Sequence, residues 1–294
     1  MIKKLTIIFF SLASTNLQTQ DFLILKNRHG NGLFSAFMEA LGGLHAYEQH
    51  QLKGLSVDFA TFGLYYDRRR GPNWWTYYFE PLHVGEVIEA NSFTELSPVS
   101  GTHVEFCYSK EENQKLIAKY IRIKPDILKE VFYFAQIHFR DKFVVGVHYR
   151  GTDKTVDPVT CEAPRVSYDK VAEAVTEQIS RLEGTPYIIF VATDEEAFLQ
   201  YMLECFANRI CFNEEAARSK DGYPPHHLPE RNRYESGKNA LIDCLLLSKS
   251  DVLIRTSSNL SLCSVYFNPG LKEIELSRRN PEYWQGDCIP IQEL

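Results

Sequence analysis

The segment "VVGVHYRGTDK" (residues 144–154) places an arginine, a carboxylate and an ammonium group directly after an apolar run. The apolar run is typical of a buried strand, so the charged residues are expected where that strand ends. Arg150 can bind a phosphate group through two parallel hydrogen bonds, which a lysine cannot reproduce. The structural alternative is an ion pair between Arg150 and Asp153 or Asp157.

Polar clusters also follow three other predicted strands. They are "RHGNG" (28–32), "ATDEE" (192–196) and "RTSSN" (255–259). In open parallel α/β sheets, ligands bind at the carboxyl ends of the strands. The glycines of "RHGNG" let the backbone approach a diphosphate closely. The hydroxyl and N–H groups of "RTSSN" lie at a predicted helix start, which also suits a phosphate. The four clusters therefore predict one nucleotide-binding cleft between two α/β domains.

The elements that would position these clusters alternate along the chain. The first half opens with a strand over 21–26 and an amphipathic helix over 33–50. In the second half we predict helices at about 125–140, 168–182, 194–206 and 238–250, and strands at 143–149, 187–193, 209–212 and 251–255. Such alternation predicts an α/β fold with a parallel sheet covered on both faces.

Composition excludes some classes of function. The chain has 294 residues and a net charge of −6, and its basic residues are dispersed apart from residues 68–70, so we expect no nucleic acid partner. Cys211 with His226 and His227 does not complete the ligand spacing of a zinc site. The aromatic segment over 61–82 is typical of core, with a sugar-binding platform as the alternative.

Residues 1–18 have the layout of a signal peptide. Lys3 and Lys4 precede a short apolar run, and small polar residues follow it. The run is too short to cross a bilayer, so we expect no stable transmembrane span. A structural first strand is the alternative, and the odd number of cysteines, seven, argues against full disulfide pairing. The expected location is therefore the secretory pathway or the exterior if the leader is real, and the cytoplasm otherwise.

Four segments resemble, in order, those of the GDP-fucose-dependent fucosyltransferases. This superfamily includes the alpha-1,6-fucosyltransferases, the rhizobial nodulation fucosyltransferase and, more distantly, the protein O-fucosyltransferases. Residues 145–154 resemble the HxRxxDK segment, and residues 187–199 resemble a strand ending in ATDD. Residues 243–267 resemble a helix aspartate followed by a strand and a Ser-Ser turn, and "RHGNG" resembles a Gly-Asn turn. The resemblance is firm over about residues 121–276.

The resemblance implies roles for individual residues. Arg150 matches the arginine that contacts the β-phosphate of the donor and stabilises the leaving GDP. The implied catalytic residues are Arg150, Asp153 and Asp194. The implied donor-binding residues are Gly30, Asn31, Gly32, His148, Lys154, Thr193, Glu195, Asp243, Thr256, Ser257, Ser258 and Asn259. Gly151 departs from the pattern, because many alpha-1,6 enzymes have a second arginine there.

The resemblance also implies a GT-B fold, in which two Rossmann-like domains face each other across a cleft. Beyond the leader, residues 19–140 would form the acceptor-side domain and residues 141–294 the nucleotide-sugar-binding domain. The alternatives are a glycosyltransferase for another nucleotide sugar and a non-catalytic glycan-binding or nucleotide-binding module.

The expected reaction is an inverting transfer of fucose from GDP-fucose to a glycan or protein acceptor, without a cofactor. The chain contains no DxD motif to hold a divalent cation on a diphosphate. Arg150, Lys154 and backbone donors would then neutralise the charge of the leaving group. Four acids are candidates for the general base: Asp153, Asp157, Asp194 and Glu195.

Overall fold

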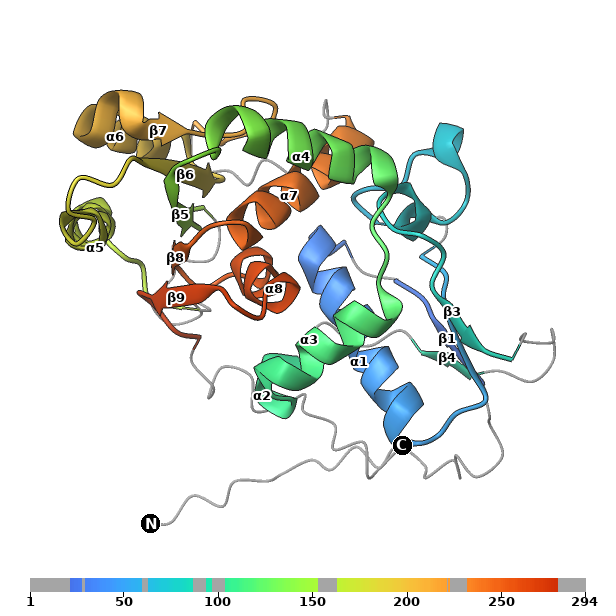
Figure 1. The fold of residues 1–294 in the computed structure, drawn as a ribbon. Coiled ribbons are helices and arrows are strands. Elements are labelled where there is room, and N and C mark those ends of the chain that lie inside the picture. Colours follow the sequence, from blue (N-terminus) through green and yellow to red (C-terminus); the bar gives the residue numbers. More distant parts are fainter. Residues whose placement is uncertain are drawn as a thin grey trace, which may run out of the picture.

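The computed structural model describes residues 22–27, 30–59, 63–86, 94–96, 104–152, 163–220, 222 and 232–279. These residues contain two sheets, of order β3-β2-β1-β4 and β7-β6-β5-β8-β9, with helices between and beside them (Figure 1). The predicted leader, Asp153, Lys154 and Asp157 lie outside the described residues, as do His226 and His227. In the part of the chain described, no helix is long and apolar enough to cross a membrane.

The four-stranded sheet is mixed. β1 (Phe22–Leu25) pairs in parallel with β2 (Gly54–Val57) and β4 (Thr94–Leu96), whereas β3 (His83–Gly85) is antiparallel to β2. The helix α1 (Leu33–Gln49) connects β1 to β2 and begins after the Gly-Asn turn. The strand and helix predicted at the start of the chain are thus confirmed. The helices α2 (Val104–Cys107) and α3 (Lys110–Tyr120) follow β4.

The five-stranded sheet is entirely parallel. Its strands are β5 (Phe143–Tyr149), β6 (Tyr187–Thr193), β7 (Ile210–Cys211), β8 (Val252–Arg255) and β9 (Lys272–Glu275). The helices of this half are α4 (Pro125–His138), α5 (Tyr168–Ser180), α6 (Glu196–Phe206), α7 (Arg233–Ser248) and α8 (Asn259–Phe267). Because Tyr149 pairs with Thr193 and His148 with Arg255, three strands end at one edge of the sheet.

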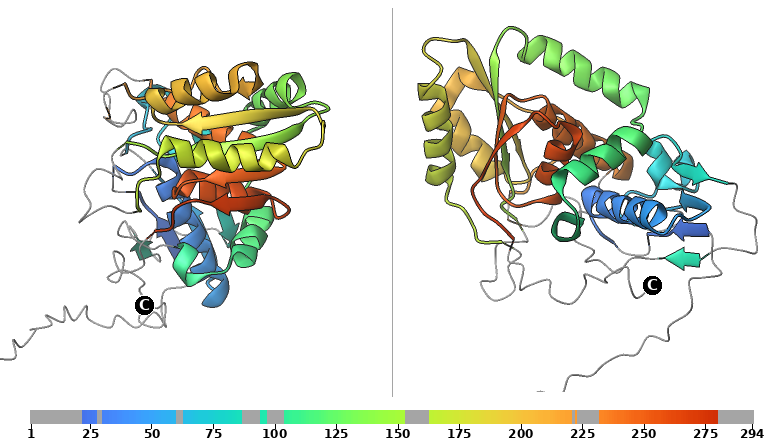
Figure 2. Two further views of the ribbon diagram at one scale, coloured as in Figure 1. Left: turned by 90° about the vertical axis from the view of Figure 1, so that its left-hand side faces the viewer. Right: turned by 60° about the horizontal axis from the view of Figure 1, so that its bottom comes forward.

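Helices cover both faces of this sheet, as the alternation predicts. One face packs against α5 and α6 in an apolar cluster that includes Val147, Val191 and Phe198. The other face packs against α4, α7 and α8. The right-hand view of Figure 2 shows the succession of layers, from α5 and α6 through the sheet to α7, α8, α1 and the four-stranded sheet.

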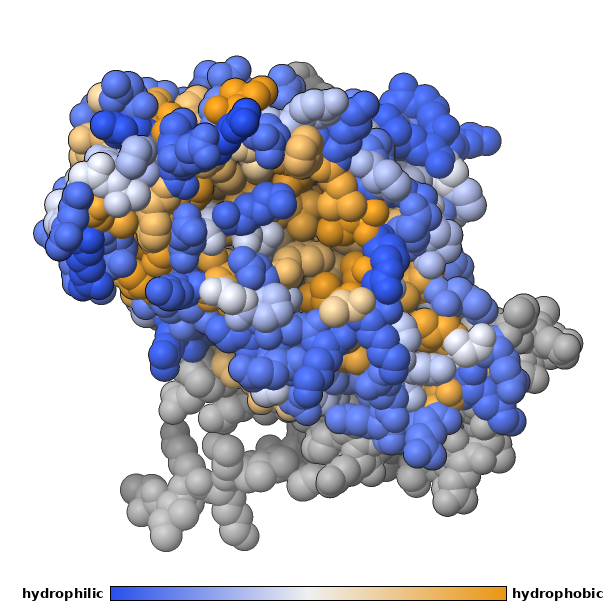
Figure 3. All heavy atoms as spheres, viewed as in Figure 1, coloured by the Kyte–Doolittle hydropathy of each residue, from blue (hydrophilic) through white to orange (hydrophobic). Residues whose placement is uncertain are grey.

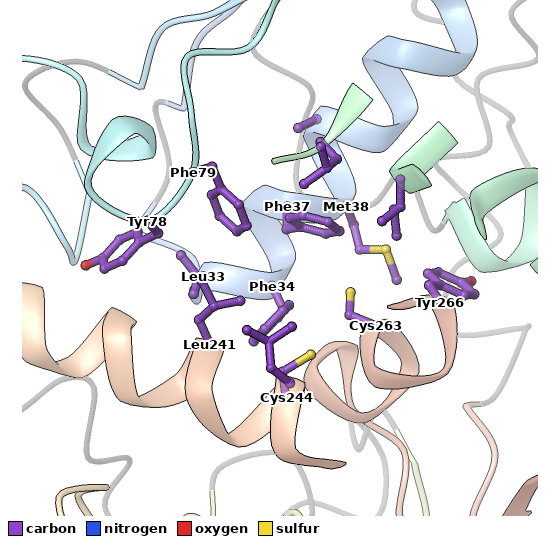
Figure 4. Packing of buried hydrophobic residues seen from close by; sticks show 14 of the residues in the cluster. Leu33, Phe34, Phe37, Met38, Tyr78, Phe79, Leu241, Cys244, Cys263 and Tyr266 are labelled. Carbon is purple, nitrogen blue, oxygen red and sulfur yellow. The ribbon is translucent and has the colours of Figure 1, made fainter. Parts of the chain in front are cut away.

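The two halves share one continuous apolar core. Leu33 and Phe34 of α1 lie beside Leu241 and Cys244 of α7 (Figure 4), and the ring of Phe37 packs on Phe267 of α8 with centroids 5.6 Å apart. The aromatic segment belongs to this core, as predicted, because Trp74 and Trp75 are each only 1% exposed. The domain boundary at residue 140 remains a prediction, and α4, which precedes it, packs against α7 of the second half.

Candidate active site at the carboxyl ends of β5, β6 and β8

Asp194, which follows β6, accepts hydrogen bonds from three consecutive residues that follow β5. Its Oδ2 atom lies 2.8 Å from Nη1 of Arg150 and accepts a bond of 2.7 Å from Oγ1 of Thr152. Its Oδ1 atom accepts a bond of 3.0 Å from the backbone N–H of Gly151. The side chains of Arg150 and Asp194 are only 18% and 13% exposed. Asp194 therefore fixes both the backbone and the guanidinium at the end of β5.

Thr256 joins the third strand to the same edge. Its Oγ1 atom accepts a bond of 2.9 Å from the backbone N–H of Arg150, and its own N–H donates to the carbonyl of His148 at 3.0 Å. Ser258 then caps α8 by accepting a bond from the N–H of Leu260, so the predicted helix start at Asn259 is confirmed. The positive end of the α8 dipole thus lies beside Arg150, where an anion is favoured.

Three of the other predicted residues have structural roles on this edge. The buried hydroxyl of Thr193 accepts a bond of 3.2 Å from the N–H of Glu195, and the N–H of Ser257 donates to Oγ of Ser277 at 3.1 Å. His148 is buried, and desolvation lowers its pKa to about 3. The His148 ring is therefore neutral at ordinary pH.

Glu195 occupies the space in front of Gly151. An ideal Cβ atom on Gly151 would lie 1.8 Å from Oε2 of Glu195 and 2.7 Å from a ring carbon of Tyr149, so a side chain there would require its neighbours to shift. The other oxygen of Glu195, Oε1, lies 3.2 Å from Nη2 of Arg165. Burial raises the pKa of Glu195, while Tyr168 and Arg165 act in the opposite direction. Arg165 has no sequence signal, and we did not predict it as a site residue.

Asp243 lies in a separate buried polar cluster on α7. Burial raises its pKa to about 7, against the lowering effects of Arg218 and Asn213. Nη2 of Arg218 donates to the carbonyl of Asn213 at 2.8 Å. The segment that carries both residues is tied to Asp194, because the N–H of Ser219 donates to the Asp194 carbonyl at 2.8 Å. Asp243 is thus linked to the site through that segment, and its predicted donor-binding role remains a prediction.

The Gly-Asn turn brings a second buried acid with it. Gly30 is exposed, Gly32 precedes the first residue of α1, and the amide of Asn31 lies 3.5 Å from Oε1 of Glu39. The Asn27 amide lies 3.4 Å from Oε2 of the same carboxyl group. Glu39 is 3% exposed, and burial raises its pKa to about 7. Glu39 was not predicted as a site residue, although a glutamate on the apolar face of a helix is a signal of a buried acid.

A hollow of about 520 Å³ lies elsewhere. It is lined by the carboxyl-terminal ends of α4, α7 and α8, including Phe139, Lys249 and Phe267. Figure 3 shows apolar side chains at the surface near α4 and α7. These helix ends lead into β5 and β8, so the hollow lies at the sheet edge opposite Arg150. Among the residues described, no group of three or more His, Cys, Asp or Glu side chains could hold a metal ion.

Comparison with known proteins places the chain in a family. Residues 99–278, more than half of the chain, match the family model of Nodulation protein Z (NodZ). The chain belongs to the NodZ family. This match covers three of the four segments, all except "RHGNG", and confirms the resemblance to GDP-fucose-dependent fucosyltransferases. No curated protein matches the chain in sequence.

Solved structures similar to this NodZ family member share its fold. A NodZ alpha-1,6-fucosyltransferase soaked with GDP-fucose has a TM-score of 0.58 and 16% identity, covering 88% of this chain and 99% of that chain. Fucosyltransferase NodZ from Bradyrhizobium has a TM-score of 0.53 and 15% identity, covering 88% of this chain and 99% of that chain. A mutant of Arabidopsis thaliana FUT1 in complex with GDP has a TM-score of 0.52 and 9% identity, covering 93% of this chain and 74% of that chain. The predicted GT-B fold is confirmed.

Proposed function

We propose that the protein is an inverting glycosyltransferase that transfers fucose from GDP-fucose to a glycan or protein acceptor. The observation that carries the proposal is the ion pair of Arg150 with Asp194 beside the amino end of α8. A rigid guanidinium and a helix amino terminus at the same strand edge suit a diphosphate leaving group. Membership of the NodZ family and the GDP-bound states of the similar structures support guanosine as the nucleoside.

In the proposed reaction, the bond between fucose C1 and the β-phosphate oxygen breaks, and its electron pair stays on GDP. An acceptor hydroxyl oxygen forms the new bond to C1 from the opposite face, and its proton passes to a general base. Arg150 neutralises the charge that develops on the leaving β-phosphate, without a metal ion. Lys154, four residues further along the sequence, would supply a second positive charge.

We assign Asp194 a positioning role. Both of its oxygens already accept hydrogen bonds, from Arg150, Gly151 and Thr152, so it is a poor acceptor for a further proton. Asp153 is one of the four candidate acids and directly follows the residues that Asp194 fixes in the sequence, so we propose it as the general base.

Thermal stabilisation by nucleotides tests the proposal. A ligand that binds the native state raises its melting temperature, so GDP and GDP-fucose should do so, also in the presence of EDTA. Arg150→Ala should lose most of this response. Arg140→Ala removes an exposed arginine that lies beside Asp141 and is the matched control, so it should keep the response.

Three outcomes would count against the proposal. Stabilisation by UDP-sugars or ADP-sugars alone would indicate another donor. A strict need for added metal would refute the metal-independent mechanism. Binding of GDP-fucose without release of GDP, over a panel of glycan and glycoprotein acceptors, would favour a non-catalytic binding module.

A further inference from the structure

Two adjacent acids at the end of β6 each hold an arginine. Asp194 pairs with Arg150, and Glu195 pairs with Arg165 through Oε1 and Nη2 at 3.2 Å. Arg150 follows β5 directly, whereas Arg165 comes from the segment that precedes α5. The two ion pairs therefore tie two arginines, 15 positions apart in the sequence, to neighbouring residues at the end of β6.

Gly151 lies between the two ion pairs. Its N–H donates to Asp194, and its missing side chain leaves the space that Oε2 of Glu195 fills. Any larger residue at position 151 would displace the Glu195 carboxylate and with it the partner of Arg165. The bare backbone of Gly151 is thus what allows Glu195 to hold Arg165 at the same end of the sheet as Arg150.

The backbone beside Arg165 is fixed by Tyr149, the last residue of β5. The Tyr149 hydroxyl donates a bond of 2.9 Å to the carbonyl of Val166, and the Tyr149 ring stacks on Phe198 with centroids 4.2 Å apart. Tyr149 is buried, so the anchor is rigid. The Arg165 side chain itself is 49% exposed, compared with 18% for Arg150. A fixed backbone with a half-exposed guanidinium is suited to ligand contact.

We infer that Arg165 is a second cation of this site, which contacts the terminal phosphate of a nucleoside diphosphate together with Arg150. The inference rests on the proposed function and adds a residue to it. A role in stability alone is the competing explanation. It is weaker, because solvent-exposed ion pairs contribute little to folding, whereas a charge-assisted bond to phosphate is strong. Glu195 and the Tyr149 hydroxyl would orient the guanidinium through two of its five N–H donors and leave the other donors for the ligand.

Binding of GDP and GMP, measured by isothermal titration calorimetry, tests the inference. Both ligands contain the guanosine and the α-phosphate, and only GDP has the terminal phosphate. Arg165→Ala should weaken GDP binding by about 10-fold or more, as expected for loss of one charge-assisted bond, and GMP binding by less than about 3-fold. Arg165→Lys should lie in between, because it keeps the charge and loses the planar fork.

The matched control is Arg181→Ala. Arg181 is an exposed arginine of the same region that pairs with Glu177 on α5, and its loss should leave both affinities unchanged. Melting temperatures of all variants should stay within a few degrees of the wild type.

Failure of the inference can be separated from failure of the proposed function. If the wild type does not bind GDP, the proposed function is wrong. If it binds GDP and Arg165→Ala binds equally well, Arg165 is not a phosphate ligand. If GDP and GMP binding weaken equally, or if both Arg165 variants bind more weakly and also melt at a lower temperature, Arg165 has a structural role and the inference is overturned.

Discussion

The Nη1 atom of Arg150 lies 2.8 Å from the Oδ2 atom of Asp194, although the two residues are 44 positions apart and follow different strands. The parallel pairing of β5 with β6 sets this distance, because Tyr149 and Thr193 are register partners at the strand ends. The same oxygen of Asp194 also accepts a bond from Thr152. Arg150 is therefore held in place before any ligand arrives, so binding need not order it.

Arg150→Lys tests whether this arrangement serves catalysis. Lysine keeps the charge and loses the fork that can contact Asp194 and a phosphate together. We expect turnover, measured as GDP release with a fucosyl acceptor, to fall by at least about 100-fold, as for loss of one transition-state donor. The melting curve should change little, because lysine keeps a positive charge beside Asp194. Turnover near that of the wild type in a folded variant would show that Arg150 is only an ion-pair partner.

Asp194→Asn tests the positioning role of the carboxylate. Asparagine has nearly the same shape, but its amide nitrogen cannot accept the bonds that Arg150 and Thr152 donate to Oδ2. We expect unfolding in urea to show a loss of about 1–3 kcal/mol, together with a lower kcat. Asp169→Asn is the control, because Asp169 accepts one bond from Tyr201 at an exposed position, so its loss should be smaller. An Asp194→Asn protein as stable as the wild type would contradict the role.

The strands that carry the site could be predicted because their residues are buried on both faces. β5 and β6 are continuous apolar runs of seven residues, followed at once by charged residues. By contrast, β9 has the sequence "KEIE" and was missed, since its apolar content is a single isoleucine and its pairing depends on β8. The helix α7 begins at Arg233, five residues before the predicted start, because Asn232 caps it by accepting a bond from the N–H of Glu235.

The residues at the strand ends could be predicted individually, but their partners could not. The sequence suggested Asp153 or Asp157, which lie outside the described residues, as ion-pair partners of Arg150, and it gave no indication of the pair with Asp194 that the structure shows. That contact depends on strand order and register, which local patterns do not encode. Arg165 was missed for the same reason, since only the Tyr149 and Glu195 contacts bring it to the site.

Gly151→Ala tests the close approach of Glu195. The new methyl group would overlap the carboxylate, so the variant must displace Glu195 or shift the backbone between Arg150 and Thr152. We expect a clear loss of stability from the single substitution and a smaller loss when it is introduced into a Glu195→Ala protein. A double-mutant cycle measures the coupling as the difference between the two losses. Gly30→Ala is the control, because its added methyl group meets open space. Additive effects at positions 151 and 195 would show that the two residues do not compete for space.

Glu39→Gln tests the pH dependence caused by the buried acid beneath the Gly-Asn turn. Burial raises the pKa of Glu39 from 4.5 to about 7, so between these values the folded protein holds a proton that the unfolded chain releases. The stabilising contribution is therefore present at low pH and is lost as the pH rises toward and through 7. Between pH 5 and pH 8 this loss corresponds to about 2–3 kcal/mol, which glutamine, lacking an ionisable proton, should not show. Urea unfolding of both proteins at pH 5 and pH 8 measures this loss of stability.

Glu48→Gln, on the same helix, is the control. A hydrogen bond from Lys119 lowers the pKa of Glu48, so Glu48 holds no proton at pH 5 that it would release by pH 8. Its replacement should therefore leave the loss of stability between pH 5 and pH 8 unchanged. If wild type and Glu39→Gln lose stability in parallel from pH 5 to pH 8, Glu39 is ionised throughout and its proton does not contribute to the fold.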